Sequence, residues 1–278
     1  MLVLPTVASV RERLAREASV AFVPTMGNLH EGHLELVRIA ARHAPCVVAS
    51  IFVNRLQFAP HEDFDRYPRT FQEDCARLEK LGVAGVFAPD EAELYPQPQQ
   101  VLVEPPPVGN TLEGRFRPGF FRGVATVVLK LFNIVQPQFA VFGKKDYQQL
   151  FVIREMVGQL NLPIQIVAGE TCRDSDGLAL SSRNKYLNSA QRKEAPRLHS
   201  TLLWVKKELE SGNRDFRGLE KSAHDNLDKS GWNVDYVALQ QQTTLDQAHA
   251  GDRALVVLGA AKLGATRLID NVEVFLGT

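Results

Sequence analysis

The strongest constraint on the fold is a repeated alternation of short apolar runs with longer amphipathic stretches. The apolar runs suited to strands are residues 20–23, 46–53, 83–88, 139–142 and 164–167. Stretches with helical spacing lie between them, including residues 123–135 and 147–160. Strands that alternate with helices are typical of a parallel sheet covered by helices. The sequence therefore predicts an α/β fold with a Rossmann-like parallel sheet.

The last third of the chain has a different pattern. Charged helical stretches occupy residues 190–229, and strand-like runs follow at 234–239, 254–258 and 267–274. A chain of 278 residues exceeds the usual size of one domain. We therefore expect a Rossmann-like domain over residues 1–180 and a smaller α+β domain over residues 181–278.

The composition disfavours several classes of protein. The 32 Lys and Arg residues balance 32 Asp and Glu residues, so no global charge attracts nucleic acid. No apolar run approaches the roughly 20 residues of a membrane span, and no leader segment is evident. Three cysteines without metal-ligand spacing indicate reduced thiols rather than disulfides or zinc. We expect a cytoplasmic protein with no nucleic-acid or membrane partner.

A histidine-rich motif follows the first apolar run. His30, Glu31, Gly32 and His33 stand where a strand should give way to a helix. Glycine allows close backbone approach, a helix N-terminus offers N–H groups, and imidazoles donate hydrogen bonds. These features favour a phosphate site, although two surface histidines are the plainer alternative. Zinc is disfavoured, because helical zinc pairs usually have i, i+4 spacing and no third ligand is evident.

Further polar residues follow the other apolar runs. Asn54 and Gln57 come after the second run, where ligands bind in parallel sheets. After the fourth run, Gly143 permits close approach and Lys145 offers a positive charge, whereas Asp146 can bond ribose hydroxyls or order the loop. An exposed glutamine and a solvated lysine–aspartate turn are the alternatives.

Two more segments complete the set of motifs. Ser181, Ser182 and Arg183 supply two hydroxyls and a cation suited to phosphate oxygens, at a place that suggests closure over a nucleotide. Thr70 with Glu73 forms a capping-box pattern that opens a helix, and Gly82 can close it. We interpret that helix as scaffold.

Taken together, these motifs resemble the pantothenate synthetase (pantoate–β-alanine ligase) family within the H-x-G-H nucleotidyltransferase superfamily. The resemblance is carried by residues 24–33, 50–58, 67–70, 142–149 and 176–184. Residues 267–271, Arg-Leu-Ile-Asp-Asn, also match, and we interpret them as structural.

The resemblance implies a specific reaction. ATP would activate (R)-pantoate as a pantoyl-adenylate, and β-alanine would then displace AMP to give pantothenate. It also implies a homodimer that uses Mg²⁺–ATP, with no organic prosthetic group and no protein ligand that we name for the metal. The nucleotide and pantoate would bind residues 1–180, with residues 181–278 acting as a lid.

The resemblance also assigns residues. His33, His30 and Lys145 are the expected catalytic residues, and Gln57 and Gln149 would bind pantoate. Asn54 is expected at the substrate site, where it would support the pocket geometry or bind the second substrate. The expected ATP-binding residues are Met26, Gly27, Asn28, Leu29, His30, Glu31, Gly32, His33, Gly143, Lys144, Lys145, Asp146, Cys172, Leu180, Ser181, Ser182 and Arg183.

Four residues depart from the family pattern, and one of them is Cys172, which stands where an aliphatic residue is common. Arg55 stands where proline is common, Lys144 where glutamate is frequent, and Phe120 where histidine often occurs. We expect Lys144 to add positive charge near the nucleotide and Phe120 to remove a polar contact. Arg117 lies in a segment that resembles the family's mobile flap, as a plausible closing cation.

Two other functions remain open at this stage. One is a different H-x-G-H adenylyltransferase with a phosphate acceptor, which would favour Arg or Lys at positions 57 and 149 rather than glutamine. The other is a non-catalytic ATP-binding regulator or RNA-interacting module, whose RNA version the neutral charge disfavours.

Overall fold

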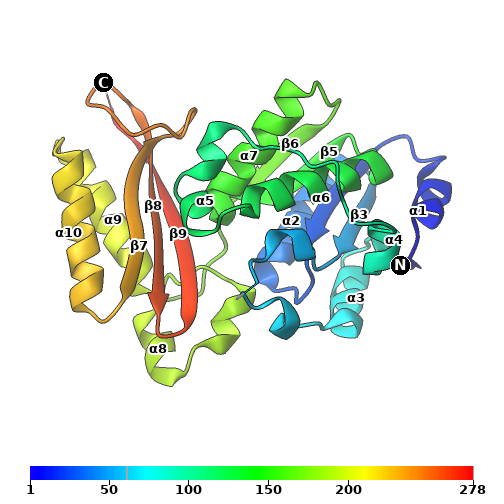
Figure 1. Ribbon diagram of the computed structural model, residues 1–278, viewed down its shortest axis with the longest axis horizontal. Helices are drawn as coiled ribbons and strands as arrows, with labels where there is room; N and C mark the ends of the chain where they lie inside the picture. Colours follow the sequence, from blue (N-terminus) through cyan, green and yellow to red (C-terminus); the bar gives the residue numbers. More distant parts are fainter. Residues whose placement is uncertain (61, 278) are drawn as a thin grey trace. The chain divides into compact units, whose positions relative to one another are not determined.

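The apolar runs form one six-stranded parallel sheet in a computed structural model that describes residues 1–60 and 62–277 (Figure 1). Its strands are β1 (Leu2–Leu4), β2 (Val20–Thr25), β3 (Cys46–Ile51), β4 (Gly85–Phe87), β5 (Phe139–Gly143) and β6 (Gln165–Gly169). Their order is β1-β4-β3-β2-β5-β6, and every neighbouring pair is parallel. The predicted Rossmann-like sheet is confirmed.

Helices cover both faces of this sheet because alternate strand residues point to opposite sides. Phe22 and Val48 face one core, which includes the inner side of α6, whereas Ala21 and Val47 face the core under α2. The helices of this part are α1 (Val7–Leu14), α2 (Glu31–His43), α3 (Phe71–Lys80), α4 (Glu91–Leu94), α5 (Glu113–Phe116), α6 (Phe120–Val135) and α7 (Tyr147–Gln159). Among the residues that the structure describes, no helix combines the length and apolar character of a membrane span.

Short 3-10 turns connect several of these elements. They are η1 (Arg55–Gln57), η2 (Phe64–Arg66), η3 (Pro107–Asn110), η4 (Lys144–Asp146) and, later in the chain, η5 (Ser182–Tyr186). Turn η1 comes shortly after strand β3, and turn η4 comes directly after strand β5. They therefore carry the polar residues that the sequence places after those strands.

Several short elements and one cap differ from the sequence prediction. β1 and α1 were not predicted, since three strand residues that pair only with β4 leave a weak pattern. Helix α3 begins after Thr70 and is closed by Gly82 with φ +73°, as predicted. The predicted capping box is wrong, because the Thr70 side chain makes no cap and instead donates to Asp74 Oδ2 at 3.1 Å.

The last part of the chain forms a second unit with its own core. Its antiparallel sheet contains β7 (Asn233–Gln241), β8 (Ala254–Leu263) and β9 (Thr266–Phe275) in that order. Its helices are α8 (Ser189–Glu194), α9 (Arg197–Glu210) and α10 (Phe216–Lys229). Both α9 and α10 pack on this sheet (Figure 1), where Leu202 and Leu227 are fully buried.

The two structural units are not separated at a single position in the sequence. The first unit comprises Met1–Lys144 and Gln149–Glu170, whereas Lys145–Gln148 groups with the residues from Thr171 onward in the second. The residues predicted to bind a nucleotide are therefore distributed over both units.

The sheet order gives the first unit one place where the direction of winding reverses. From β2 the chain proceeds through β3 to β4 on one side, and β5 and β6 lie on the other. Open parallel sheets bind ligands beyond the carboxyl ends of the strands at such a switch point. The residues that follow β2 and β5 here are Met26 and Lys144, the starts of two predicted nucleotide segments.

Candidate active site

The loop between β2 and α2 is held by the carboxylate of Asp74, a residue of α3. Gly27 and Asn28 both have positive φ, +79° and +50°. The amides of Asn28 and Leu29 each donate to Asp74 at 2.8 Å, and the Asp74 side chain is almost fully buried. A Cβ at Gly27 would lie 3.1 Å from that carboxylate, so glycine is needed for both backbone angle and space. Asp74 therefore fixes the path of the loop.

This arrangement changes how the loop can bind an anion. The amides of Asn28 and Leu29 are already donated to Asp74, so they are not the donors for a phosphate. The first turn of α2, which begins at Glu31, still directs its N–H groups and dipole toward the carboxyl ends of the strands. Sequence analysis missed Asp74 because its partners lie about 45 residues earlier in the chain.

The two histidines of the motif are in contact. Their ring centroids lie 4.1 Å apart, and the backbone N–H of His30 donates to Nδ1 of His33 at 3.3 Å. A neutral imidazole that accepts at Nδ1 carries its proton on Nε2. Helix α2 thus fixes His33 in the tautomer that presents an Nε2–H donor.

Asn54 and Gln57 form a network whose donors and acceptors can be assigned. Oδ1 of the buried Asn54 accepts from the Tyr95 hydroxyl at 2.9 Å and from the amide of Leu56. Its Nδ2 must therefore donate, and it does so to Oε1 of Gln57 at 3.0 Å and to the carbonyl of Gly123 at 3.2 Å. Burial raises the pKa of the Tyr95 phenol, with a contribution from Glu91, so the hydroxyl remains a donor.

This network gives the Gln57 amide a defined direction. Since its oxygen faces Asn54, its NH₂ group points the other way and lies 3.1 Å from Sδ of Met26. A thioether is a weak acceptor that a substrate oxygen readily replaces. Gln57 follows β3 and Gln149 follows β5, the two strands that flank β2. The two predicted pantoate residues thus lie in segments that follow the carboxyl ends of the two strands next to β2, one on each side of the histidine loop.

Close packing of α6 completes this part of the first unit. A Cβ at Gly123 would lie 2.1 Å from the Leu56 carbonyl oxygen, so only glycine lets α6 approach η1. The close approach also brings the Gly123 carbonyl to Asn54. Gly123 therefore supports the amide network.

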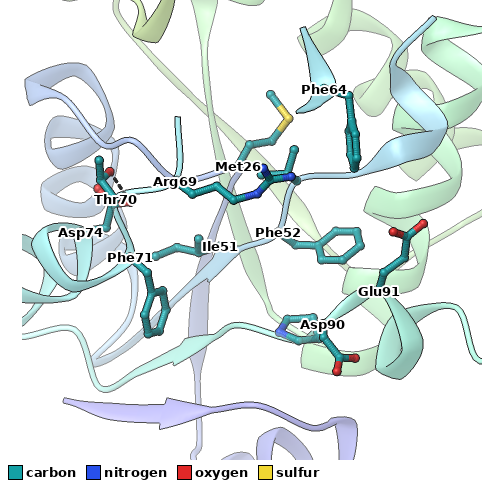
Figure 2. A pocket seen from close by; sticks show the side chains of 13 residues that line it. Met26, Ile51, Phe52, Phe64, Arg69, Thr70, Phe71, Asp74, Asp90 and Glu91 are labelled. Carbon is teal, nitrogen blue, oxygen red and sulfur yellow. Dashed lines mark hydrogen bonds between the residues drawn. The ribbon is translucent and has the colours of Figure 1, made fainter. Parts of the chain in front are cut away.

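A separate cavity of about 260 Å³ lies at the carboxyl ends of β2, β3 and β4. Figure 2 shows Arg69 extending toward Phe64, while Asp90 and Glu91 lie together at another side of the cavity. Its full lining is Met26, Gly27, Ile51, Phe52, Val53, Phe64, Arg69, Thr70, Phe71, Asp74, Pro89, Asp90 and Glu91. Met26 and Gly27 are the members that belong to the predicted site, so this cavity adjoins the histidine loop from the β4 side.

The second predicted nucleotide segment continues β5. Nζ of Lys144 pairs with Glu170 at 2.7 Å, so a neighbouring carboxylate balances the charge that the sequence adds there. Lys145 Nζ lies 3.7 Å from the Asp146 carboxylate, and its backbone carbonyl accepts from Asn271 Nδ2 at 3.0 Å. Lys145 retains partial exposure, as a phosphate-binding side chain requires.

The third segment is a short hairpin that leads into η5. Arg173 bridges Ala179 in antiparallel fashion, and the Leu180 amide donates to the Cys172 carbonyl at 2.9 Å. Ser181 Oγ then accepts from the Arg183 amide at 3.3 Å, which starts the 3-10 turn. The hairpin fixes the point at which the Ser181, Ser182 and Arg183 loop begins.

The other departures from the family pattern have local partners. Arg55 lies over the Phe64 ring, 3.9 Å from its centroid, and pairs with Glu91 at 3.1 Å. Arg117 lies 3.7 Å over the Phe120 ring, so Phe120 supplies a cation–π contact.

Arg117 is engaged rather than solvated in this structure. It forms a two-bond ion pair with Glu62, at 2.6 and 2.7 Å, and donates to the Gln57 carbonyl at 3.2 Å. The pair is well covered, with side-chain exposures of 13% and 17%. These bonds fasten the segment that resembles a flap to the chain around Gln57.

The chain is similar to one family of known proteins over almost its whole length. The family model described as pantoate-beta-alanine ligase matches residues 3–273. The pantothenate synthetase of Nitrosospira multiformis is 64% identical over 274 residues, 99% of this chain and 98% of its own length. That of Chromobacterium violaceum is 58% identical over 276 residues, 99% of this chain and all of its own.

Solved structures show the same likeness. The crystal structure of pantothenate synthetase from Thermus thermophilus superposes with a TM-score of 0.94 at 45% identity, covering 99% of this chain and 100% of that one. A pantoate-beta-alanine ligase from Francisella tularensis, described as complexed with "Beta-gamma ATP" and β-alanine, has a TM-score of 0.82 at 31% identity, with 98% and 97% of the chains covered. This chain belongs to the pantoate–β-alanine ligase family.

Proposed function

We propose that this protein condenses (R)-pantoate with β-alanine at the expense of ATP, giving pantothenate, AMP and pyrophosphate. The observation that carries the proposal is the pair of directed donors at the switch point of the sheet. His33 is fixed as an Nε2–H donor after β2, and Gln57 presents its NH₂ group after β3. One suits phosphate, and the other suits a carboxylate or hydroxyl. Family membership supplies the identity of the acid and the amine.

In the first step a carboxylate oxygen of pantoate attacks the α-phosphorus, and the bond to the β-phosphate breaks to release pyrophosphate. The carboxylate is already ionised near neutral pH, so the step needs alignment and charge neutralisation rather than a strong base. Negative charge grows on the phosphate oxygens. His33, His30 and Lys145 are the groups we assign to stabilise it, and Gln57 with Gln149 would hold the acid.

In the second step the neutral amine of β-alanine attacks the acyl carbon. The carbon–oxygen bond to AMP breaks, AMP leaves, and the amine loses its extra proton. The Ser181, Ser182 and Arg183 loop supplies hydroxyls and a cation for phosphate oxygens in our proposal. The remaining ATP-binding residues expected from the resemblance keep that assignment.

Several properties expected from the family stay predictions. Magnesium would enter as the Mg²⁺–ATP substrate, held on phosphate oxygens and water. Across residues 1–60 and 62–277, no three His, Cys, Asp or Glu side chains gather as a metal site. A homodimer, a cytoplasmic location, and the absence of a prosthetic group, nucleic acid or membrane partner are likewise predictions. Sedimentation of the purified protein tests the dimer.

The assay that tests the function separates the two steps. Labelled pyrophosphate should exchange into ATP only with pantoate present, and AMP should be released only after β-alanine is added. Exchange without pantoate, or with a phosphorylated acceptor in its place, would contradict the proposal in favour of another adenylyltransferase. ATP binding without any turnover would indicate a regulator.

Two variants test the assigned residues. His33→Ala and Lys145→Ala should each lower the exchange rate at least tenfold, about 1.4 kcal/mol of lost barrier stabilisation. The matched controls are His43→Ala, at the other end of the same helix, and Lys193→Ala, an exposed lysine of α8. Near-normal exchange in both site variants would refute their roles.

A further inference from the structure

Strand β9 contains a family motif to which the proposed function gives no role. The motif is residues 267–271, and its last two members, Asp270 and Asn271, are both buried although polar. A buried carboxylate is costly unless it is paired and hydrogen-bonded. The partners of these two side chains therefore indicate what the motif does.

Asp270 forms a two-bond ion pair with Arg173. Nη1 of Arg173 donates to Oδ2 at 2.6 Å and Nη2 donates to Oδ1 at 2.8 Å. Oδ1 also accepts the amide of Asn271 at 2.8 Å, and His199 Nδ1 lies 3.4 Å from Oδ2. Only 4% of the Asp270 side chain is exposed. Paired, planar and hydrogen-bonded ions of this kind define one geometry.

Arg173 transmits that geometry to the hairpin before the serine–arginine loop. Besides Asp270, its guanidinium donates to the carbonyls of Gly177, at 3.1 Å, and Asn271, at 3.3 Å. Its backbone pairs with Ala179, two residues before Ser181. A change at Asp270 therefore reaches the start of the Ser181, Ser182 and Arg183 loop through one side chain and one β-bridge.

Asn271 holds the other nucleotide segment of the same unit. Its Nδ2 donates to the carbonyl of Lys145 at 3.0 Å. Two residues further along β9, the Glu273 carboxylate accepts from the Tyr147 hydroxyl at 3.1 Å, which fastens the same short segment a second time. One strand is thus bonded to both Lys145 and the hairpin that precedes Ser181.

We propose that Asp270 and Asn271 are positioning residues that set Lys145 and the serine–arginine loop at the spacing ATP requires. The inference rests on the proposed function, because it assigns the two held segments to ATP phosphates. Neither residue needs to touch substrate. Their effect is on the geometry of the groups that do.

The chain offers a matched control for a purely structural role. Arg267 Nε pairs with Asp235 Oδ2 at 2.6 Å on the same sheet, with side-chain exposures of 19% and 12%. The Arg173–Asp270 pair has exposures of 20% and 4%. Asp235→Asn therefore removes an ion pair of the same sheet whose two members are neither Lys145 nor part of the hairpin before Ser181.

The test compares Asn271→Ala, Asp270→Asn and Asp235→Asn in pyrophosphate exchange. We expect KM for ATP to rise about fivefold for Asn271→Ala and about tenfold for Asp270→Asn, with KM for pantoate unchanged. Asp235→Asn should leave both KM values unchanged. An unchanged KM for ATP in both β9 variants, or an equal rise in the control, would overturn the proposal.

A double-mutant cycle identifies the route of the effect. If Asn271 acts through Lys145, the Asn271→Ala change should have little further effect on KM for ATP once Lys145 is alanine. Additive effects of the two changes would contradict that route. Asn271→Ala leaves no unpaired buried charge, so it remains informative if Asp270→Asn fails to fold.

Hydrogen exchange of backbone amides measures whether the hairpin before Ser181 is held in place, and it does so without any catalysis. In ligand-free protein, Asp270→Asn should speed exchange of backbone amides in residues 172–180, whereas Asp235→Asn should not. If the wild type shows no pantoate-dependent exchange of pyrophosphate, the proposed function fails and this measurement still decides the structural part. Unchanged amide exchange in Asp270→Asn would contradict the inference.

Discussion

The Gln57 amide in the first unit and the hairpin before Ser181 in the second are held by different physical means. In the first unit, Asn54 and the Tyr95 hydroxyl direct the Gln57 amide through neutral hydrogen bonds, and one buried carboxylate, Asp74, binds backbone amides. In the second unit, the hairpin is held by ion pairs, with Arg173 bonded to Asp270 and Arg192 bonded to Asp174 and Asp176.

The difference matters because the two kinds of contact respond differently to conditions. A network of neutral amides holds its side chains in the same orientation at every pH at which none of its members gains or loses a proton. Ion pairs lose strength when the carboxylate is protonated, and exposed pairs also weaken with salt. We therefore expect the direction of the Gln57 amide to be insensitive to pH and the geometry of the hairpin before Ser181 to be sensitive to it.

The largest effect should come from Asp74. Asp74→Asn leaves one acceptor oxygen for two buried amides, and the hydrogen bonds lost are those of a charged acceptor. We expect about 3 kcal/mol less free energy of unfolding in urea, and a lower exchange rate as the histidine loop loses its support. Glu73→Gln, an exposed neighbour on α3, is the control and should change neither. A stable, fully active Asp74→Asn variant would show that the loop holds itself.

The next effect concerns Asp270 and pH. Burial opposes ionisation of Asp270, but its interactions with the nearby His199 and with Arg173 outweigh that effect, so its pKa is lowered. A lowered folded pKa gives stability that is present above the unfolded value of about 3.9 and lost as pH falls through the folded value.

Asp270→Asn should accordingly cost about 2 kcal/mol of unfolding free energy at neutral pH. The gap between wild type and variant should narrow as the pH falls below about 3.9. Urea titrations of both proteins over that range measure it. A gap that stays constant at low pH would mean that the Arg173–Asp270 pair contributes through packing rather than charge.

Part of the fold and part of the candidate site could be predicted from the amino-acid sequence. Periodicity predicted the strands of the parallel sheet and the last three strands, because apolar runs bounded by turns report burial directly. The same reasoning missed β1, whose three residues are stable only beside β4. The histidine and Asn54–Gln57 segments were recognisable, since polar residues at the ends of apolar strands stand out locally.

The supports for those segments could not be read from the chain. Asp74 bonds amides about 45 residues away, and Tyr95 bonds Asn54 across 41 residues. Nothing local distinguishes such a carboxylate or phenol from a surface one. Asp270 and Asn271 were noticed as a motif and interpreted as structural, because their partners at residues 173 and 145 are apparent only in the fold.

A smaller effect is expected at Tyr95. Tyr95→Phe removes the hydroxyl that donates to Asn54 Oδ1 but keeps the buried ring. We expect about 1 kcal/mol less stability and a rise of about fivefold in KM for pantoate, with KM for ATP unchanged, because Gln57 is less firmly directed. A change in KM for ATP instead would remove the distinction between the two regions.

The smallest effect should come from Arg192. Its pairs with Asp174 and Asp176 are partly exposed, with side-chain exposures of 35% and 42%, and the Arg192 hydrogen bond lowers the pKa of Asp176. Surface pairs contribute little, so Arg192→Gln should cost less than about 1 kcal/mol and lose even that in high salt. Urea titration at two salt concentrations measures it. A larger loss would indicate that the hairpin depends on Arg192 as well as Arg173.

In the proposed first step, a carboxylate held beside the histidine loop attacks the α-phosphorus of ATP. Pantoate labelled with ¹⁸O in its carboxylate tests this directly in a single turnover with β-alanine. One labelled oxygen should appear in AMP and none in pyrophosphate. Unlabelled AMP, or label in pyrophosphate, would show that the pantoate carboxylate does not attack the α-phosphorus.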